Sequence, residues 1–225
     1  MFHRPLLLGH RGARSSASVT ENSVASFDLA LQHHCDGFEF DVRLTACGRA
    51  LVCHDPEVDG IKIAQAERNQ LLNLPVLPDV LARYAKNAFL DIEVKVAGLD
   101  SQLLLALQEH PPQRGYVVSS FLTEVLTNLR LRSGAVTLGL VCERPKQLDR
   151  WRELPVDYVI PHCSLITHDL VKEMQDAGKQ LIAWTVNDQP TMLRLAEWGV
   201  NGIISDHTEL LTRAFGAEDG RRARA

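Results

Sequence analysis

The sequence predicts an α/β protein built as a single (β/α)8 barrel, a TIM barrel in which eight parallel strands alternate with helices. Short apolar runs alternate along the chain with stretches whose apolar residues recur at helical spacing. Eight such strands remain once a short β-hairpin after the second strand is set aside. The length of 225 residues lies within the range of one barrel, and no repeat or linker indicates a second domain.

The composition is typical of a globular protein with a sizeable core, since 45% of the residues are hydrophobic and 23% are charged. The formal net charge is −4, and the only basic block is the short segment 221–224. A chain with this charge lacks the electrostatic footprint of a nucleic-acid binder, so we expect no nucleic acid among its partners.

The five cysteines form no CxxC pair, and the apolar run at 5–8 is too short for a signal peptide. No stretch approaches the roughly 18 apolar residues of a membrane span. From these features we expect a cytoplasmic protein without membrane insertion. Whether it is a monomer or a homodimer stays open.

The first unit of the barrel begins with a buried strand at residues 6–8, which enters the polar loop 9–12. Polar residues at 20–23 precede a helical pattern from 24 to 33, and Asn22 or Thr20 can cap the start of that helix. Another strand follows, so this part of the chain predicts a βαβ unit.

The second strand, residues 37–43, carries two acidic residues at period 2. Glu39 and Asp41 therefore share one face, while the aromatic and branched residues beside them take the other. Two confined carboxylates repel, and burying them without a partner is costly, so we expect a positive group beside them. The alternative is a half-exposed strand with a solvated acidic face.

Residues 50–54 form the next apolar run, only a few residues after the acidic strand. A parallel crossover needs a dozen or more residues, so this run must return antiparallel, in a hairpin that turns at Gly48. The hairpin is expected to bring His54 and Asp55 back towards Glu39 and Asp41.

The widest connection, residues 56–87, is predicted to contain weak helices at 64–72 and 78–85. Strands are then predicted at 89–94, 116–119, 136–141, 156–160, 181–186 and 202–205, and helices at 100–109, 123–131, 146–151, 169–177, 190–198 and from 209 onward. We assign residues 1–215 to the barrel and residues 216–225 to a disordered tail.

Ionisable residues gather at the C-terminal ends of these strands, where a barrel builds its site. Glu39 and Asp41 on the second strand and Glu93 on the third supply three carboxylates. This all-oxygen set suits Mg²⁺ or Ca²⁺ better than zinc. Asp91 shares the face of Glu93 but lies deeper, so we leave it out of the ligand set.

Two cations, Arg11 and Lys95, lie at the same end of the predicted barrel. Three carboxylates with a divalent ion keep one net negative charge, and the two cations turn this into one positive charge. A phosphodiester would neutralise it. Arg11 is the candidate for bidentate phosphate binding, and Lys95 is the candidate for a point charge.

His10 and His54 are the natural candidates for general acid and base, because imidazole titrates near neutrality without a large perturbation. Taken alone, each histidine is more often a core or capping residue than a catalyst. Two histidines at strand ends beside three carboxylates favour the catalytic interpretation.

With these residues the chain resembles the glycerophosphodiester phosphodiesterases over residues 6–206. The resemblance rests on short motifs in the family's order: His-Arg-Gly at 10–12, Glu-Asn-Ser at 21–23, Glu-Phe-Asp-Val at 39–42, His-Asp at 54–55, Glu-Val-Lys at 93–95, Trp-Thr-Val-Asn at 184–187 and Gly-Ile-Ile-Ser-Asp at 202–206. No one motif is decisive, but together and at barrel spacing they are specific.

The resemblance implies a (β/α)8 barrel and metal-dependent hydrolysis of a small glycerophosphodiester to glycerol 3-phosphate and an alcohol. In the family, the glycerol hydroxyl next to the ester attacks to give a cyclic phosphate, which water then opens. By position, the implied roles are acid and base for His10 and His54, phosphate binding for Arg11 and Lys95, and cation binding for Glu39, Asp41 and Glu93. Trp184 at a strand end suits the apolar face of glycerol, so we expect it in the pocket wall.

The chain departs from the family pattern in two places. Ser23 stands where the family usually has Thr, a mild change because both carry a hydroxyl. The segment 55–74 is short and lacks the family's glycine- and threonine-rich loop, so we expect a more open pocket for the leaving group, which leaves the identity of the substrate open.

Several secondary candidates keep two interpretations each. Glu21 and Asn22 can cap a helix or orient Arg11. Ser119 and Phe121 can line the pocket or shape a turn. His162 can contact the residues that line the site without contacting the substrate itself. Asp206 can cap the last helix, so we leave it out of the site.

Two other functions stay open at this point. The first is a phosphate-binding barrel without catalysis, against which the intact pair of histidines argues. The second is a different metal-dependent barrel enzyme, such as a lyase, which would need Lys95 as its base because Lys95 is the only lysine at a predicted strand end.

Overall fold

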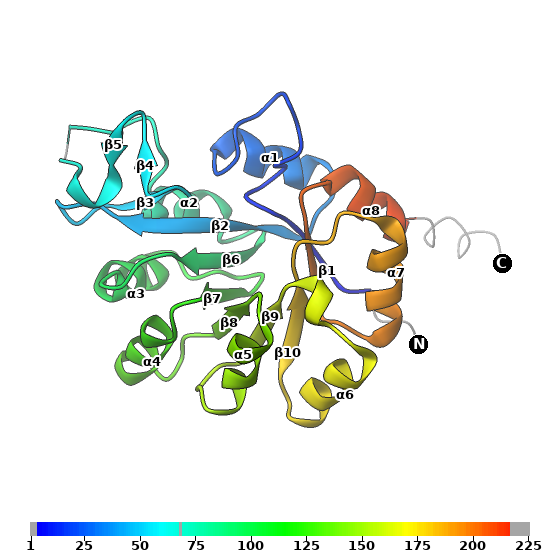
Figure 1. The fold of residues 1–225 in the computed structure, drawn as a ribbon. Coiled ribbons are helices and arrows are strands. Elements are labelled where there is room, and N and C mark those ends of the chain that lie inside the picture. The colour runs from blue at the N-terminus through cyan, green and yellow to red at the C-terminus, as the bar shows by residue number, and fades with distance from the viewer. Residues whose placement is uncertain (1–3, 68, 217–225) are drawn as a thin grey trace.

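The computed structural model describes residues 4–67 and 69–216, and its central feature is a closed ring of parallel strands (Figure 1). The ring runs β1, β2, β6, β7, β8, β9, β10, β11 and returns to β1, which pairs with both β2 and β11. The bounds are β1 (Leu6–Gly9), β2 (Gly37–Leu44), β6 (Phe89–Val94), β7 (Tyr116–Ser120), β8 (Leu138–Cys142), β9 (Tyr158–Pro161), β10 (Gln180–Ala183) and β11 (Gly202–Ser205). The predicted (β/α)8 barrel is confirmed.

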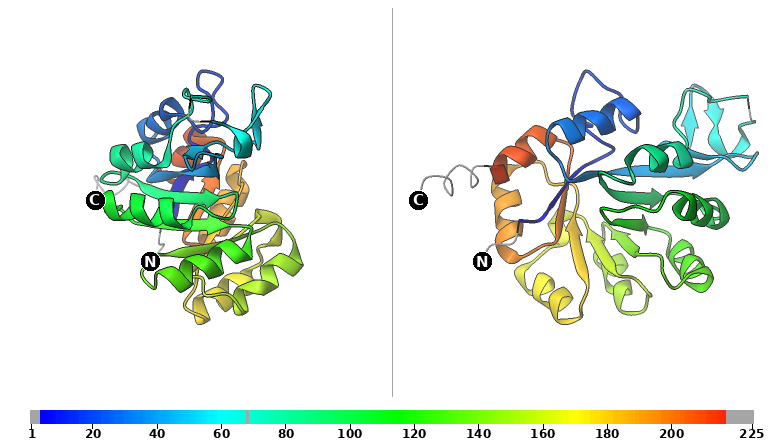
Figure 2. Two further views of the ribbon diagram at one scale, coloured as in Figure 1. Left: turned by 90° about the vertical axis from the view of Figure 1, so that its left-hand side faces the viewer. Right: turned by 180° about the vertical axis from the view of Figure 1, so that it is seen from behind.

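Helices lie around the outside of the ring, as the views in Figures 1 and 2 show. They are α1 (Val24–Gln32), α2 (Leu77–Tyr84), α3 (Asp100–Glu109), α4 (Thr123–Arg132), α5 (Pro145–Leu148), α6 (His168–Asp176), α7 (Gln189–Trp198) and α8 (Thr208–Gly216), with short 3-10 turns η1 (Ile63–Gln65), η2 (Asp149–Arg152) and η3 (Cys163–Leu165). None of the described helices combines the length and the apolar character that crossing a membrane would require. Of the tail expected at 216–225, Gly216 still belongs to α8, and residues 217–225 lie outside the described residues.

The predicted hairpin after the second strand is confirmed. Strand β3 (Ala50–Val52) pairs antiparallel with the end of β2, with Leu44 opposite Ala50. Gly48 sits in the turn with a φ of +83°, a conformation that glycine adopts without strain. Past the strand, the amide of Cys53 donates to the carbonyl of Asp41 at 3.0 Å, so the hairpin returns alongside the acidic strand.

The helix predicted at 64–72 is wrong. Among the described residues of 64–72, the only helical element is the end of the 3-10 turn η1, and the rest is turn or irregular structure. Just before it lies a second small hairpin that was not predicted, β4 (Glu57–Val58) with β5 (Ile61–Lys62). Asp59 and Gly60 occupy its turn with positive φ angles, the Asp-Gly signal of a tight hairpin turn. This hairpin projects beyond the ring of helices in both figures. The neighbouring prediction of a helix at 78–85 is confirmed as α2.

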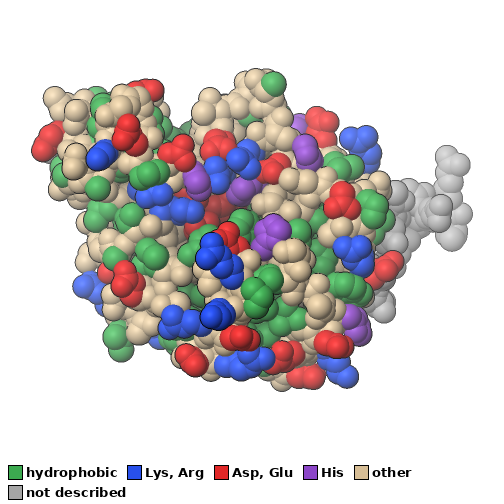
Figure 3. Space-filling model, viewed as in Figure 1, with side chains coloured by type: hydrophobic (Ala, Val, Ile, Leu, Met, Phe, Trp, Pro, Cys, Tyr) green, Lys and Arg blue, Asp and Glu red, His purple; other side chains and the backbone are tan. Residues whose placement is uncertain are grey.

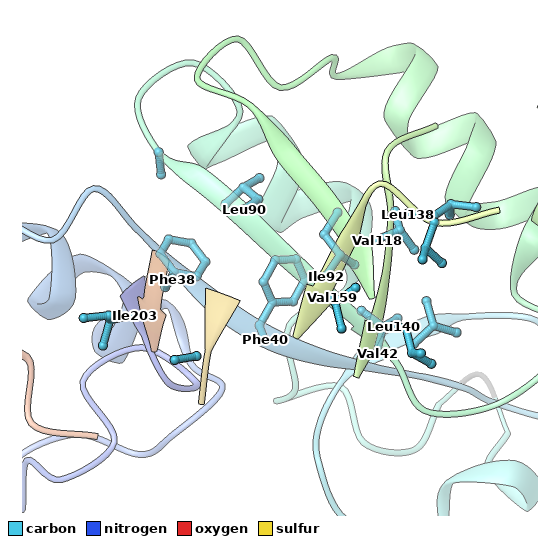
Figure 4. Close-up of a cluster of buried hydrophobic side chains, with 14 of the residues drawn as sticks. Phe38, Phe40, Val42, Leu90, Ile92, Val118, Leu138, Leu140, Val159 and Ile203 are labelled. Atoms are coloured by element: carbon cyan, nitrogen blue, oxygen red, sulfur yellow. The ribbon is translucent and has the colours of Figure 1, made fainter. Parts of the chain in front are cut away.

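Strand β2 separates an apolar outer layer from a polar interior. Its residues Phe38, Phe40 and Val42 are buried between the barrel and the helices, beside side chains of the next strands (Figure 4). Phe27 from α1 stacks on Phe38 with ring centroids 4.2 Å apart, and Tyr84 from α2 meets the same ring edge-on at 5.0 Å. The predicted division of this strand into an apolar and an acidic face is confirmed.

The interior of the barrel is filled by a separate apolar cluster. It consists of Leu8, Phe89, Val117, Val141, Ile160, Ile182 and Ile204, one from almost every strand. The acidic side chains of β2 and β6 lie among these strands but nearer to their C-terminal ends. The apolar cluster therefore forms a floor, and the polar residues above it face the open end of the barrel.

Candidate active site

Three carboxylates from neighbouring strands meet inside the C-terminal end of the barrel. Asp41 on β2 lies opposite Glu93 on β6, and Glu39 precedes Asp41 by two residues on the same face. One oxygen of each residue lies within 4.8 Å of the others. Figure 3 shows acidic side chains in a hollow near the centre of this face, with Lys, Arg and His side chains around them.

The electrostatics of this cluster favour a cation. Burial and the neighbouring charge of Asp41 raise the pKa of Glu39 well above its ordinary value. Burial also raises the pKa of Glu93, although Lys95 opposes the shift. Among the described residues, no group donates a hydrogen bond to Glu39 Oε1. A divalent cation fits this set, because three hard oxygen donors converge and one of them has a free lone pair.

Lys95 lies directly beside the carboxylates. Its Nζ atom is 2.5 Å from Glu93 Oε1 and 3.3 Å from Asp41 Oδ1. Burial opposes ionisation, but the charges of Glu93 and Asp41 outweigh it and raise the pKa of Lys95. The ammonium group also lies 5.6 Å from the ring centre of Phe121. The expected positive group beside the acidic strand is therefore present.

Arg11 supplies a second cation from the loop after β1. Its backbone amide donates to Glu39 Oε2 at 3.0 Å, and its Nε atom lies 3.3 Å from Asp41 Oδ2 without the alignment of a hydrogen bond. The loop turns sharply here, with φ angles of 51° at Arg11 and 80° at Gly12. A Cβ atom on Gly12 would lie 2.5 Å from Ser26 Oγ, so only glycine fits the turn.

Glu21 and Asn22 form hydrogen bonds with other candidate site residues, and neither caps the helix. Glu21 Oε1 accepts from Nη1 of Arg11 at 2.7 Å, which confirms the orienting alternative for Glu21. Asn22 Nδ2 donates to Asp41 Oδ2 at 2.8 Å, and Asn22 Oδ1 accepts from the amide of Asp41 at 3.2 Å. The predicted N-cap of α1 at Asn22 or Thr20 is wrong, because Ser23 accepts from the amide of Ser26 in that role.

His10 lies at the base of the loop, beside the carboxylate cluster. Its Nε2 atom is 3.9 Å from Glu39 Oε2, and its Nδ1 atom is 2.7 Å from Asp206 Oδ1. A carboxylate only accepts hydrogen bonds, so Nδ1 carries the proton and Nε2 faces the cluster. Burial opposes ionisation of Asp206, but hydrogen bonds from His10 and Asn187 lower its pKa.

Asp206, which the sequence analysis left out of the site, contacts His10. Helix α8 begins at Thr208, and the carboxylate of Asp206 accepts from His10, Arg14 and Asn187. A signal was available, because closing the barrel pairs Gly9 with Ser205 and so makes the next residue of each strand a neighbour of the other.

His54 lies where the hairpin ends, on the rim of the site. Its Nδ1 atom is 2.8 Å from Asp55 Oδ1, and its carbonyl accepts from Nε of Arg43 at 2.7 Å. About a third of its side chain is exposed. Among the described residues, no hydrogen bond or ion pair joins His54 to the three carboxylates. Its ring nevertheless shares one feature with His10, since Nδ1 contacts an aspartate in both.

Trp184 and Ser119 help to line a small pocket, whose lining is His10, Glu39, Asp91, Glu93, Ser119, Val141, Ile160, Trp184 and Ile204. The indole of Trp184 donates to the carbonyl of Ile160 at 3.0 Å and meets Phe121 and His162 edge-on. The hydroxyl of Ser119 donates to Asp91 Oδ1 at 2.6 Å.

Asp91 lies in this pocket as a buried carboxyl group. Burial raises its pKa to about 8, and the hydrogen bond from Ser119 opposes the shift. It lies outside the group of three converging carboxylates. His162 accepts at Nδ1 from the amide of Ser164 and so caps η3, besides packing against Trp184.

Comparison with known proteins places this geometry in a family. The model of the glycerophosphoryl diester phosphodiesterase family matches residues 10–65 and 61–210. The chain belongs to this family. The matched residues include each of the eight residues predicted from the sequence to form the site.

Curated relatives in the phosphodiesterase family match along most of the chain. A glycerophosphodiester phosphodiesterase of Caldanaerobacter subterraneus is 27% identical, and the match covers 92% of this chain and 96% of the relative. A glycerophosphodiester phosphodiesterase of Bacillus subtilis is 26% identical, with 92% of this chain and 85% of the relative covered.

Solved structures of the family share the fold of this phosphodiesterase-family chain. A phosphodiesterase of Oleispira antarctica, solved in complex with the product sn-glycerol-3-phosphate, superposes with a TM-score of 0.82 at 23% identity, covering 94% of this chain and 97% of that one. A glycerophosphodiester phosphodiesterase of Thermotoga maritima superposes with a TM-score of 0.81 at 21% identity, covering 95% of this chain and 99% of that one.

Proposed function

We propose that this chain hydrolyses small glycerophosphodiesters to glycerol 3-phosphate and an alcohol, with the help of one divalent cation, Mg²⁺ or Ca²⁺. Family membership supports the reaction class. The observation that carries the proposal is the convergence of Glu39, Asp41 and Glu93 within 4.8 Å of one another, directly beside two partly buried cations and a histidine.

Glu39, Asp41 and Glu93 would hold the cation. Once bound, it would supply Lewis-acid stabilisation of the negative charge on a phosphoryl oxygen. The backbone amide of Arg11 and the side chain of Asn22 orient two of these carboxylates through hydrogen bonds. Such outer contacts keep ligand oxygens aimed at a common point.

Arg11 and Lys95 are proposed to bind the phosphate. Together with three carboxylates and a divalent cation, these two side chains give the site one net positive charge, as the sequence indicated. A phosphodiester with one negative charge balances it. Arg11 offers the planar fork that matches two phosphate oxygens, and Lys95 offers a compact charge from the opposite side.

His10 and His54 are proposed to transfer protons. One of them takes the proton from the attacking oxygen, and the other donates a proton to the alcohol oxygen as its bond to phosphorus breaks. In both rings Nδ1 bonds an aspartate, so Nε2 is the atom that exchanges the proton. The water that opens a cyclic phosphate would be activated by the same pair with the roles reversed.

Trp184 is proposed to contact the substrate's glycerol group. Its indole nitrogen is occupied by the carbonyl of Ile160, so the ring offers an apolar face to the pocket. Phe121, packed against it, extends this surface towards Lys95. An apolar wall beside a phosphate-binding lysine suits a short polyol whose carbon backbone lies on the ring.

The test is release of glycerol 3-phosphate from glycerophosphocholine and glycerophosphoethanolamine, with Mg²⁺, with Ca²⁺ and with EDTA. We expect product with one of the metals and none with EDTA. A barrel that only binds phosphate would release no glycerol 3-phosphate under any of these conditions. A lyase that uses Lys95 would be inactive on both esters. If the metal-loaded chain releases no product from any phosphodiester, or if His10→Ala leaves the rate unchanged, the proposal is wrong.

A further inference from the structure

Arg14 bridges two carboxylates that belong to different parts of the site. Its Nε atom donates to Glu21 Oε2 at 2.7 Å, and its Nη1 atom donates to Asp206 Oδ1 at 3.2 Å. Glu21 uses its other oxygen to accept from Arg11, while Asp206 Oδ1 also contacts Nδ1 of His10. A continuous chain of charge-assisted hydrogen bonds therefore runs from Arg11 to His10 through Arg14.

We propose that Arg14 is a positioning residue that couples the phosphate-binding Arg11 to the proton-transferring His10, through Glu21 and Asp206. The inference rests on the proposed function, from which it takes the roles of Arg11 and His10. Arg14 itself need not touch the substrate. Its planar guanidinium fixes the direction of two carboxylates at once, so the phosphate-binding and proton-transferring side chains are aligned together.

The surroundings of Asp206 support a role in alignment. Asn187 Nδ2 donates to Asp206 Oδ2 at 2.7 Å, and the backbone amide of Asp206 donates to Asn187 Oδ1 at 3.0 Å. With His10 and Arg14 on the other oxygen, both oxygens of the carboxylate are engaged. A carboxylate held on two sides transmits a displacement of one partner to the next instead of absorbing it.

The charges of the network also balance. Arg11 and Arg14 contribute two positive charges, and Glu21 and Asp206 contribute two negative ones. Burial opposes ionisation of Glu21, but hydrogen bonds from Arg11 and Arg14 lower its pKa. Without Arg14, Glu21 would keep Arg11, and Asp206 would keep His10 and Asn187, but none of these hydrogen bonds would join the two carboxylates.

A structural role alone would give a different result. The side chain of Arg14 is 40% exposed, and isolated ion pairs at such sites contribute little to stability. Arg152 offers a matched case in the outer helices, where it joins Asp149 and Glu173 with a side chain that is 48% exposed. Arg152→Ala is therefore a control for the loss of an exposed arginine that links two carboxylates.

The deciding experiment measures whether Glu21 and Asp206 are coupled, and through which residue. The kcat/KM for glycerophosphocholine is determined for Glu21→Gln, Asp206→Asn and the double variant, first with Arg14 present and then in the Arg14→Ala background. Residues of one network show non-additive effects, so we expect a coupling of about threefold or more with Arg14. We expect additive effects in the Arg14→Ala background, and unchanged coupling in the Arg152→Ala background.

Equal coupling with and without Arg14, or no coupling in either, would overturn the inference. If Arg14 instead contacts the substrate, Arg14→Ala raises KM by a factor that depends on the alcohol group, and the coupling is absent. Arg14→Lys, which keeps the charge but not the fork, supplies a second background should Arg14→Ala not fold. It is also expected to abolish the coupling.

A spectroscopic measurement keeps this result separate from the proposed function. The ¹⁵N shifts of the His10 ring report its tautomer and hydrogen bonding. We expect Glu21→Gln to move these shifts with Arg14 present, and not in the Arg14→Ala background, although Glu21 does not contact His10. Lack of product from the native chain would refute the phosphodiesterase activity alone, whereas unmoved His10 shifts would refute the coupling alone.

Discussion

The Nδ1 atom of His10, at the end of the first strand, lies 2.7 Å from Oδ1 of Asp206, at the end of the last. Closure of the barrel makes these two residues neighbours, although 196 positions separate them in the chain. The carboxylate fixes the tautomer of the imidazole and turns Nε2 towards Glu39. His54 and Asp55 repeat the relationship locally, at 2.8 Å.

The stabilisation supplied by Asp206 should depend on pH. Burial opposes ionisation, but hydrogen bonds from its neighbours lower the pKa of Asp206 below its ordinary value of 3.8. An acid whose pKa is lowered by folding stabilises the protein fully above its unfolded pKa, and this contribution is lost as the pH falls below that value. Asp206→Asn should therefore reduce the free energy of unfolding more at about pH 6 than at about pH 2.5. Urea unfolding of both proteins at each pH measures this, and equal differences would contradict it.

Binding of the divalent cation should stabilise the fold. A ligand at 100 times its Kd adds about 2.7 kcal/mol, which for a chain of this size raises the Tm by roughly 5–10 °C. We expect this shift in the native protein with Mg²⁺ or Ca²⁺ and its reversal with EDTA. Glu93→Gln removes a proposed ligand and should abolish most of the shift. Glu173→Gln, in the outer helices, should keep it. A full shift in Glu93→Gln would exclude that residue as a ligand.

Two adjacent residues before α1 should give opposite results. Asn22 holds Asp41, a proposed metal ligand, by two hydrogen bonds, so Asn22→Ala should weaken metal binding about 10- to 100-fold. Ser23 only caps α1, so Ser23→Ala should lower the free energy of unfolding by about 1 kcal/mol and leave metal affinity unchanged. Isothermal titration with the metal and urea unfolding separate the two effects. Equal metal affinities for both variants would remove Asn22 from its positioning role.

The residues that sequence could place are those whose position follows from strand periodicity. Glu39 and Asp41 share a face because strands alternate, and Glu93 joins them because β6 is the neighbour of β2 in the sheet. His54 follows from the length of the hairpin loop. Each of these inferences uses only local geometry and the order of strands around the barrel.

The residues that sequence could not place lie in loops that fold back on the site. Asn22 and Glu21 reach Asp41 and Arg11 because the chain makes positive-φ turns at Arg11 and Asn22, which spacing does not reveal. The hairpin of β4 and β5 was missed for a different reason. Its Asp-Gly turn was present in the sequence, but residues 57–62 were assigned no element, because strands of two residues are too short to show an alternating pattern.

The aromatic packing behind the acidic strand should be a main source of stability. Phe38 is fully buried between Phe27 and Tyr84, on the side of β2 opposite Glu39. Phe38→Ala should lower the free energy of unfolding by about 3–5 kcal/mol. Leu131→Ala, at a side chain that is 81% exposed, should change it by no more than about 0.5 kcal/mol. Chemical denaturation compares the two, and a loss below about 1 kcal/mol for Phe38→Ala would mean that the cluster is dispensable.

The leaving group should reveal which histidine is the general acid. A choline or ethanolamine alkoxide is a poor leaving group and needs a proton, whereas p-nitrophenolate leaves without one. Replacing either histidine by alanine should lower kcat on glycerophosphocholine by about 10²- to 10⁴-fold. On a p-nitrophenyl phosphodiester of glycerol, the variant that lacks the acid should recover most of its activity, while the variant that lacks the base should not. His110→Ala, at the C-cap of α3 and before the start of β7, is the control and should match the native protein on both substrates. The two histidines lie in different environments, since His10 is buried beside Glu39 and His54 lies on the exposed rim of the site. Equal losses on both substrates for both variants would mean that neither histidine protonates the leaving group.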